Sequence, residues 1–569
     1  MSAHANRSLA ASVLATLLGR RRSAAVPRLR GGLALERDKP GLDRPIVALP
    51  LPAELVLPLL DHRRRELTPL VRVGQRVDRG ERLAPGVLAS AAGSVVSIAP
   101  HPVIHPSGLL VPCVRILVEA PGESVEATAI APASEIVPAP TLPALERPSV
   151  ERLREAGVTG LGGAGFSTAG KLLEARERGV HTLLLNGAEC EPGIACDEAL
   201  MEVTAGEIVA GAHDLATLIG CCRVVVAVET DKRAAAAALR TAIALAEERR
   251  AGSRVRIELV EVAPVYPSGA ERLLVGLACG TRVPGPARPT AHGVLCLNVA
   301  TARAAYRARL GEPFLTRVVS VGGARAKVPC NVVAAFGTPV GYVLAASGQG
   351  ERAPGTRLRA GGPLSGFDLP DEAVPLVATT NRLALEPPRP PSTPRPCIRC
   401  AACSDVCPVA LLPQELLRHA RADDDGALVR GGLDACIECG CCDVVCPAAI
   451  PLTSTFRHAR GRLSERRAES RAAAAAEVRH RRRTERLARR AREPLGSLRQ
   501  ASPRGAESAV PGADESAGRT PAGHGVNAGT ADPTSDTILP GTASAAEPAS
   551  PTDPVAAALA RARRRGRRG

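Results

Sequence analysis

The hydrophobic and polar positions change their spacing twice in the first half of the chain. Between residues 31 and 120, short apolar runs of β type are separated by glycine and proline, which predicts strands joined by tight turns. Residues 120–147, rich in Pro, Ala and Glu, suit a linker. Between residues 148 and 285, helical patterns alternate with apolar runs at 181–185 and 223–228. This alternation predicts an α/β unit with a parallel sheet.

Short β segments return after the α/β unit, and a helical pattern follows near the end of the chain. The apolar runs at 317–321 and 332–336 predict a small α/β or β-grasp unit. Proline-rich residues 387–396 suit a hinge. Residues 456–494 have helical propensity but no clear apolar stripe, so we expect a basic helix that forms when docked. The composition of residues 495–569 predicts a disordered tail.

Length and composition limit this organisation further. A chain of 569 residues is too long for one hydrophobic core and predicts several domains. Aromatic residues make up only 1%, so the cores must be built from Ala, Val and Leu. Residues 1–30 look like a loose extension. Their apolar stretch at 9–18 is too short to cross a bilayer, and its arginines follow it, so we expect neither a membrane span nor a signal peptide.

The net charge of +16 is concentrated near the C-terminus. Residues 457–494 carry 14 Arg and 5 Glu, and residues 561–569 carry 6 Arg, so these two stretches supply +15. Such a segment suits nucleic acid, an anionic membrane surface, an acidic partner or a solvated tail. Nucleic acid is the weakest of these, because Phe456 is the only aromatic residue near this segment that could stack on a base.

Nine of the 17 cysteines lie between residues 397 and 446. Clustered CxxC units in a long chain indicate metal sites in a reducing compartment, not a disulfide framework. The sequence CIRCAACSDVCP, which begins at Cys397, returns as CIECGCCDVVCP, which begins at Cys436. Both copies follow the pattern CxxCxxCxxxCP, so the chain contains an internal repeat.

Each copy has the ligand spacing of a 4Fe–4S cluster, a centre that favours soft thiolate ligands. Three thiolates wrap one cluster, and in two-cluster ferredoxins the fourth binds the other cluster. A structural zinc site is the alternative, but it leaves the third Cys and the CP of each run unexplained. Cys441 breaks the spacing and is predicted to be a non-ligand. The two predicted ligand sets are Cys397, Cys400, Cys403 and Cys446, and Cys436, Cys439, Cys442 and Cys407.

Two further segments suit a nucleotide or a flavin. GLGGAGFSTAGK, from Gly160 to Lys171, precedes a helical pattern, so its N–H groups and the lysine can face a phosphate. Alone it is a weak signal, because glycine-rich turns are common and no clear strand precedes it. The second segment ends an apolar strand in Asn186, Glu189 and Glu191, at a place where open α/β sheets bind ligands. In isolation these acids are more often surface charges.

Taken together with Tyr266-Pro-Ser-Gly269 and the cysteine repeat, these motifs resemble the C subunit of the Rnf-type electron transport complex across residues 31–490. The central part is also similar to the flavin-binding subunit of respiratory complex I and of NAD-linked hydrogenases. The resemblance implies FMN near Gly162, Gly163, Gly165, Lys171, Asn186 and Asn298. It implies nicotinamide nucleotide near Phe166, Glu189 and Glu191, in a pocket that Tyr266, Gly269 and Glu271 also line.

The resemblance implies a multidomain α/β and α+β fold. Its expected parts are a barrel-sandwich domain (31–120), a Rossmann-like flavin domain (148–285), a β-grasp domain (312–365), a helical two-cluster ferredoxin module (387–455), the basic helix (456–494) and the disordered tail. Three positions depart from the family pattern. Ser167 replaces a proline, Ala378 replaces a lysine, and the opening segment up to Lys39 lacks His-Pro-Pro.

The function implied is that of a peripheral electron-input subunit on the cytoplasmic face of the inner membrane. NADH would give two electrons to FMN, which would pass them singly to two 4Fe–4S clusters. The implied partners are NAD(H), membrane subunits of an Rnf-type complex, and ferredoxin or another electron carrier. Two alternatives stay open: a soluble cobalamin reductase with the same flavin and cluster modules, and a non-enzymatic electron-transfer subunit whose α/β domain binds no nucleotide.

Overall fold

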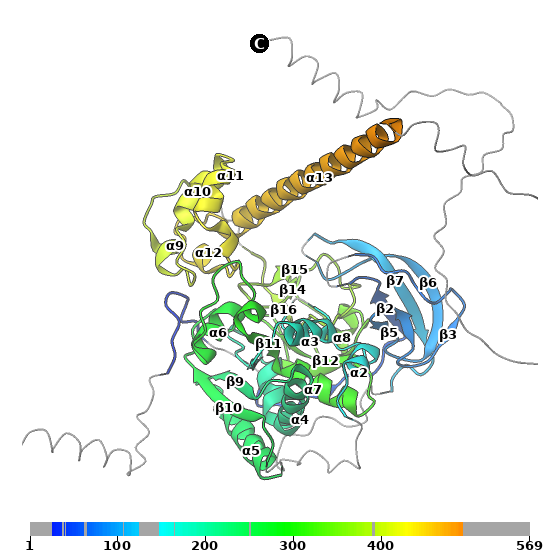
Figure 1. Ribbon diagram of the computed structural model, residues 1–569. Coiled ribbons are helices and arrows are strands. Elements are labelled where there is room, and N and C mark those ends of the chain that lie inside the picture. The colour runs from blue at the N-terminus through cyan, green and yellow to red at the C-terminus, as the bar shows by residue number, and fades with distance from the viewer. Residues whose placement is uncertain are drawn as a thin grey trace, which may run out of the picture. The chain divides into compact units, whose positions relative to one another are not determined.

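The computed structural model (Figure 1) describes most of the first 492 residues. The extension up to residue 25, most of the expected linker and the expected tail from residue 493 lie outside the described residues. One compact unit ends at Arg481, and of the second unit only the end of one helix is described. The described ranges are 26–36, 39, 41–61, 65–105, 107–123, 147–163, 165–249, 252–389 and 393–492.

The first β region is an antiparallel sheet whose strands alternate buried and exposed side chains only in part, since Leu55, Val56 and Leu57 of its first strand are all buried. Its strands are β2 (Glu54–Pro58), β3 (Arg76–Val77), β6 (Gly93–Pro102) and β7 (Leu110–Val118), in the order β2-β7-β6-β3. A separate pair, β4 (Arg82–Ala84) with β5 (Val87–Leu88), packs its apolar side chains into the same core. One face of an antiparallel sheet can thus cover a core of small aliphatic residues.

The central sheet is parallel, as the alternation of helices and strands predicts. Its strands are β8 (Thr182–Asn186), β9 (Arg223–Glu229), β10 (Arg256–Val262) and β11 (Val294–Asn298), in the order β10-β9-β8-β11. The last strand lies beyond residue 285, where the expected flavin domain ends. The chain moves from β8 outward to β10 and then returns to the other side of β8, so the strand order reverses between β8 and β11.

Helices cover both faces of this sheet, because neighbouring strand residues point to opposite sides. Leu183 and Leu185 belong to the core that packs against one group of helices, whereas Leu184 belongs to the core beneath α6 (Glu271–Cys279). Alanine-rich helix surfaces allow close packing in a chain with few aromatic residues. The first group consists of α2 (Val150–Glu155), α3 (Thr168–Glu177), α4 (Cys196–Ile219), α5 (Arg233–Arg249) and α7 (Val299–Arg309).

A six-stranded mixed sheet follows, and it draws strands from distant parts of the chain. Its order is β1-β13-β12-β16-β14-β15, with α8 (Val340–Ala346) packed against it. The first strand comes from the N-terminal region, and β16 lies beyond residue 365, the expected end of the β-grasp domain. The strands are β1 (Val47–Ala48), β12 (Thr316–Gly322), β13 (Cys330–Ala335), β14 (Arg357–Ala360), β15 (Phe367–Asp368) and β16 (Arg382–Glu386).

Short helices carry the cysteine repeat, and one long helix follows it. The short helices are α9 (Ala402–Asp405), α10 (Pro413–Arg421), α11 (Asp425–Arg430) and α12 (Cys441–Val444). The long helix is α13 (Leu452–Arg492). Among the described helices, none combines the length and the apolar character needed to cross a bilayer.

The first turns of α13 correct one expectation. The expectation of no apolar stripe is wrong here, because Leu452, Phe456, Ala459 and Leu463 recur at helical spacing and are buried in the core of the cysteine module. From residue 465 to 491 every residue is exposed, so the stripe ends where the docked part of the helix ends.

Candidate functional site

Two predicted cofactor residues end neighbouring strands at the point where the strand order reverses. Asn186 ends β8 and Asn298 ends β11, and the two are register partners in the parallel ladder. Open α/β sheets bind ligands at the carboxyl ends of strands at such a switch point. The fold therefore places these two asparagines where the sequence analysis expects a flavin.

Both asparagine side chains are oriented by hydrogen bonds. The Asn186 amide donates to the Gly269 carbonyl at 2.8 Å, and its oxygen accepts from the Ala188 N–H at 3.0 Å. Asn298 caps α7 by accepting from the Ala300 N–H at 2.8 Å, and it donates to the Asp197 carboxylate at 2.6 Å. Gly269 must be a glycine, because a Cβ there would lie 2.5 Å from the Ala188 carbonyl oxygen.

The glycine-rich loop lies beside Asn298. A Cβ built on Gly162 would lie 3.9 Å from the Asn298 Cβ, and a Cβ on Gly163 would have no heavy atom within 4 Å. Gly163 and Gly165 have positive φ angles of 99° and 63°, which favour glycine. This open space and the exposed backbone fit a ligand that approaches the loop closely, as the phosphate or ring of FMN would.

The helix after the loop supplies positive charge. Ser167 caps α3, because its hydroxyl accepts from the Gly170 N–H at 3.3 Å. The Lys171 ammonium lies 5.6 Å from the centre of the Phe166 ring. Glu271 begins α6, and burial raises its pKa although nearby Lys171 and Arg272 oppose the shift.

Glu189 serves the structure as a helix cap and an ion-pair partner. Its carboxylate accepts from the N–H groups of Asp197 at 2.9 Å and Glu198 at 3.3 Å, at the start of α4. Lys39, from the segment before the first sheet, lies 3.4 Å from the Glu189 carboxylate and 2.9 Å from that of Glu198. Burial opposes ionisation of Glu189, but Lys39 and Lys232 outweigh it and lower the pKa of Glu189.

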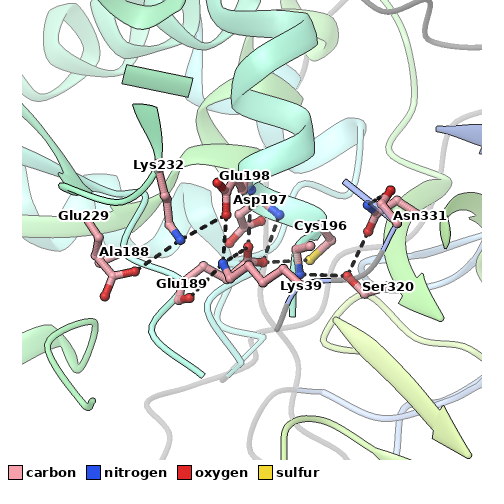
Figure 2. A network of polar contacts seen from close by, with 12 residues as sticks. Lys39, Ala188, Glu189, Cys196, Asp197, Glu198, Glu229, Lys232, Ser320 and Asn331 are labelled. Carbon is pink, nitrogen blue, oxygen red and sulfur yellow. Dashed lines mark hydrogen bonds and ion pairs between the residues drawn. The ribbon is translucent and has the colours of Figure 1, made fainter. Parts of the chain in front are cut away.

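This buried charge network continues past α4 (Figure 2). Lys232, whose side chain is fully buried, lies 3.2 Å from both the Glu198 and the Glu229 carboxylates. Asp197 is the exception to the pairing, because burial and the Glu189 charge raise its pKa to about 6. Sequence analysis did not identify Lys39 or Lys232 as network members, since no local spacing indicates contacts that join residues 39 and 189.

Glu191 joins the parallel sheet to the six-stranded sheet. Its carboxylate accepts from the Leu364 N–H at 2.5 Å, and from the Ser365 N–H at 2.7 Å and hydroxyl at 2.5 Å. The exposed fraction of Glu191 is 7%. Both acids predicted to bind nucleotide are thus used in internal contacts in this structure.

Tyr266 connects the unit built on the parallel sheet to the cysteine repeat. We call this unit, residues 150–309, the flavin-type fold. Its hydroxyl donates to the Cys439 carbonyl at 2.7 Å, and its ring is buried with Cys190 and Cys441. The structure therefore directs this side chain toward the cysteine module, although the resemblance implies a place in the nucleotide pocket. The segment of Tyr266 also reaches the end of β8, because the Gly269 carbonyl accepts from the Asn186 amide.

The first predicted cysteine set lines one cavity. Cys397, Cys400 and Cys403 come from the first copy of the repeat, and Cys446 comes from the second. The remaining lining is mostly apolar, including Ile398, Val445 and Leu452. Four sulfur donors around an apolar cavity fit an iron–sulfur cluster by their chemistry. The first copy of the repeat would supply three of the ligands, and the second copy would supply the fourth.

The two copies of the repeat have matching backbone conformations, 39 residues apart. Positive φ angles occur at Arg399 and Glu438, and again at Ala401 and Gly440. Non-glycine residues adopt such angles rarely, so the match indicates that both loops are bent for the same purpose. Cys436, Cys439, Cys442 and Cys407 occupy the equivalent positions for the second set. The extra thiol, Cys441, is 1% exposed and packs against Tyr266.

Family models match three parts of the chain. The RnfC barrel sandwich hybrid domain matches residues 27–121, the Nuo51 FMN-binding domain matches residues 153–307, and the 4Fe-4S dicluster domain matches residues 394–450. The second match extends through β11 and α7, in agreement with the observed parallel sheet. These matches support the multidomain layout expected from the sequence.

Curated relatives carry one description. The C subunit of the ion-translocating oxidoreductase complex of Pseudomonas aeruginosa is 39% identical over 418 residues, which is 71% of this chain and 51% of that protein. The same subunit of Erwinia tasmaniensis is 39% identical over 393 residues, which is 67% of this chain and 46% of that protein. The chain therefore spans about half the length of the curated relatives it matches.

One solved structure is a more distant match. The NAD+-reducing NiFe hydrogenase in its H2-reduced state is 21% identical, with a TM-score of 0.38, and the match covers 48% of each chain. A likeness of this size is too low to carry an inference about activity.

Proposed function

We propose that this chain, a relative of the Rnf-type C subunit over most of its length, passes electrons from NADH through FMN to two 4Fe–4S clusters. The identity to the curated relatives and the matches to FMN-binding and dicluster domains support a redox role. The single observation that carries the proposal is the cavity lined by Cys397, Cys400, Cys403 and Cys446. This cavity unites the four ligands that the repeat predicts, from both of its copies.

The residues at the switch point have distinct roles in this proposal. The glycine loop and the N-terminus of α3 offer N–H groups to a phosphate, and Lys171 adds a positive charge. Asn186 and Asn298 hold polar groups at the carboxyl edge of the sheet, where a ring edge can bind. Bound FMN supplies the conversion between the two electrons of a hydride and the single electrons that iron–sulfur clusters accept.

The proposed setting is a membrane-bound, ion-translocating complex. The relatives are described as subunits of an ion-translocating oxidoreductase complex, which supports membrane subunits as partners. We place the chain peripherally on the cytoplasmic face of the inner membrane, with ferredoxin or another carrier at the far end of the electron route. The exposed basic part of α13 suits contact with an acidic partner or with anionic lipid.

A second candidate is an electron-transfer subunit that does not oxidise nucleotide. The observation in its favour is that Glu189 and Glu191 are buried and bonded to Lys39, to α4 and to the loop at Leu364. Nucleotide binding through these carboxylates would require some of the bonds to break. In this alternative the clusters are the same, and the flavin domain is a scaffold.

An anaerobic titration with NADH distinguishes the two candidates. The full chain would be reconstituted with FMN, iron and sulfide, and its visible spectrum followed as NADH is added. Bleaching of both the flavin band and the broad iron–sulfur absorption is the expected result. Clusters that dithionite reduces but NADH does not would reject nucleotide oxidation by this chain and favour the second candidate.

A further inference from the structure

The contacts that Tyr266, Arg272 and Gly285 make between the flavin-type fold and the cysteine module lie at one of the two predicted cysteine sets. The Tyr266 hydroxyl bonds to the Cys439 carbonyl at 2.7 Å, and Arg272 on α6 donates to the Ala435 carbonyl at 2.8 Å, next to Cys436. A Cβ on Gly285 would lie 2.8 Å from the Ala435 Cα, so the two backbones approach closely there.

The N-terminal segment contacts the same set from another direction. Leu33 pairs with Tyr266 through two backbone hydrogen bonds of 2.8 and 2.9 Å, and the Gly32 N–H donates to the Val406 carbonyl at 2.8 Å. A Cβ on Gly31 would lie 3.0 Å from the Cys407 carbonyl oxygen. Cys407 is the ligand that the first copy of the repeat lends to the second set.

Two of the four cysteines of the other set face solvent, and the remaining two are half-buried. Cys397 and Cys400 are exposed, and Ile398 between them has an exposed fraction of 68%. Among the described residues, the cavity of this set is lined only by residues of the cysteine module and the start of α13. The two sets therefore differ in position: one lies against the flavin-type fold, and the other lies at the free side of the module.

We infer that electrons enter the module at the set formed by Cys436, Cys439, Cys442 and Cys407 and leave it at the set formed by Cys397, Cys400, Cys403 and Cys446. This inference rests on the proposed function. With FMN and both clusters bound, the reduced flavin would give up its two electrons one at a time and release its proton to water. Each electron would pass to the cluster held by the first set, then to the cluster held by the second, and would reduce one molecule of an external one-electron carrier protein. Tyr266 is the positioning residue, because its segment touches both Asn186, through Gly269, and Cys439.

Removing one cluster at a time tests this order. In the reconstituted full chain, Cys400→Ser removes the proposed exit cluster and Cys439→Ser removes the proposed entry cluster. After mixing with NADH and rapid freezing, the reduced cluster is followed by its EPR signal. The signal after addition of dithionite gives the total amount of reducible cluster. The cluster left in Cys400→Ser should be reduced at the wild-type rate. The cluster left in Cys439→Ser should be reduced by NADH about tenfold or more slowly. The reverse ranking, or equal rates, would overturn the inference.

The same experiment separates this inference from the proposed function. If NADH fails to bleach the flavin of the wild-type chain, nucleotide oxidation is rejected, and photoreduction of the flavin replaces NADH as the start of the reaction. The ranking of the two variants then still tests the order of the clusters.

A hydroxyl deletion provides a test that needs no loss of a ligand. Tyr266→Phe removes a donor whose positive end faces Cys439, and hydrogen bonds near the sulfurs help to set cluster potentials. In an EPR-monitored redox titration, Tyr266→Phe should lower the midpoint potential of the proposed entry cluster, which is the one that survives in Cys400→Ser. The midpoint potential of the other cluster should not change. Tyr342→Phe is the matched control, because its hydroxyl bonds to the Leu51 carbonyl in a different part of the fold. A shift confined to the other cluster, or no shift, would contradict the assignment.

Discussion

Lys39 shows how one residue from an irregular segment can hold a folded domain together. Its side chain is 7% exposed and lies between Glu189 and Glu198. Lys39→Met would leave two buried carboxylates without this partner and should lower the free energy of unfolding by about 3–5 kcal/mol in urea denaturation. Arg223→Met is the control, because its pair with Glu258 is about half exposed on both sides and should contribute less than about 1 kcal/mol. Equal losses of stability in the two variants would show that the buried ion pairs of Lys39 contribute no more than an exposed pair does.

Asp197 gives the same network a pH dependence. Because its pKa is raised to about 6, the folded protein binds a proton more tightly than the unfolded chain does. This contribution to stability is complete below the unfolded pKa of about 4 and is lost as the pH rises through about 6. Asp197→Asn stays neutral, so the wild type should lose stability relative to this variant as the pH rises from about 4 to about 6. A difference in urea midpoints that is independent of pH would contradict the shift.

The candidate site could be predicted from the sequence only where its residues follow one another along the chain. The glycine loop, the Asn186 segment and the cysteine repeat each carry local spacing, so they were identified. No local pattern encodes the tertiary contacts that join Lys39 to Glu189, Glu191 to Ser365 and Tyr266 to Cys439. For that reason the bonds of Glu189, Glu191 and Tyr266 were not foreseen.

At the scale of an element, α13 divides into a docked part and an exposed part. Leu463 is 5% exposed and closes the apolar stripe, whereas Leu487 is 51% exposed. Leu463→Ala should destabilise the cysteine module by about 2–5 kcal/mol, since it opens a cavity in a core. Leu487→Ala, the same substitution on the same helix, should have almost no effect. Chemical denaturation followed by loss of the cluster absorption measures both, and equal effects would contradict this division.

Two of the four strands of the central sheet, β8 and β9, were predicted from their apolar runs, whereas β10 and β11 were not. Apolar runs at 181–185 and 223–228 became β8 and β9 with only small shifts of their ends. The place of β1 in a sheet with β13 could not be predicted, because two residues carry no periodic signal and the pairing joins segments that lie far apart in the chain. Chain order predicts local elements well and long-range pairing poorly.

At the scale of the whole molecule, Gly362 marks a tight contact between two sheets. A Cβ there would lie 2.0 Å from the Glu191 side-chain carboxyl carbon. Gly362→Ala should displace Glu191 from the loop at Leu364 and lower the free energy of unfolding by about 1–3 kcal/mol. This loss should lower the thermal unfolding midpoint by several degrees. Gly322→Ala is the matched control, because a Cβ on Gly322 meets no atom within 4 Å. A loss of stability in the control alone would refute the role given to this contact.

The proposed exchange of the fourth cysteine between the two copies of the repeat would have a consequence for how the protein is made. As a nascent chain leaves the ribosome, the first copy presents three thiols for one site and a single thiol, Cys407, for the other. The site that uses Cys407 has its full set of ligands only when Cys442 has been synthesised, and the other site only when Cys446 has been synthesised. With this exchange, no complete ligand set forms before the second copy is translated, and a chain that stops before the second copy would yield no complete centre instead of one.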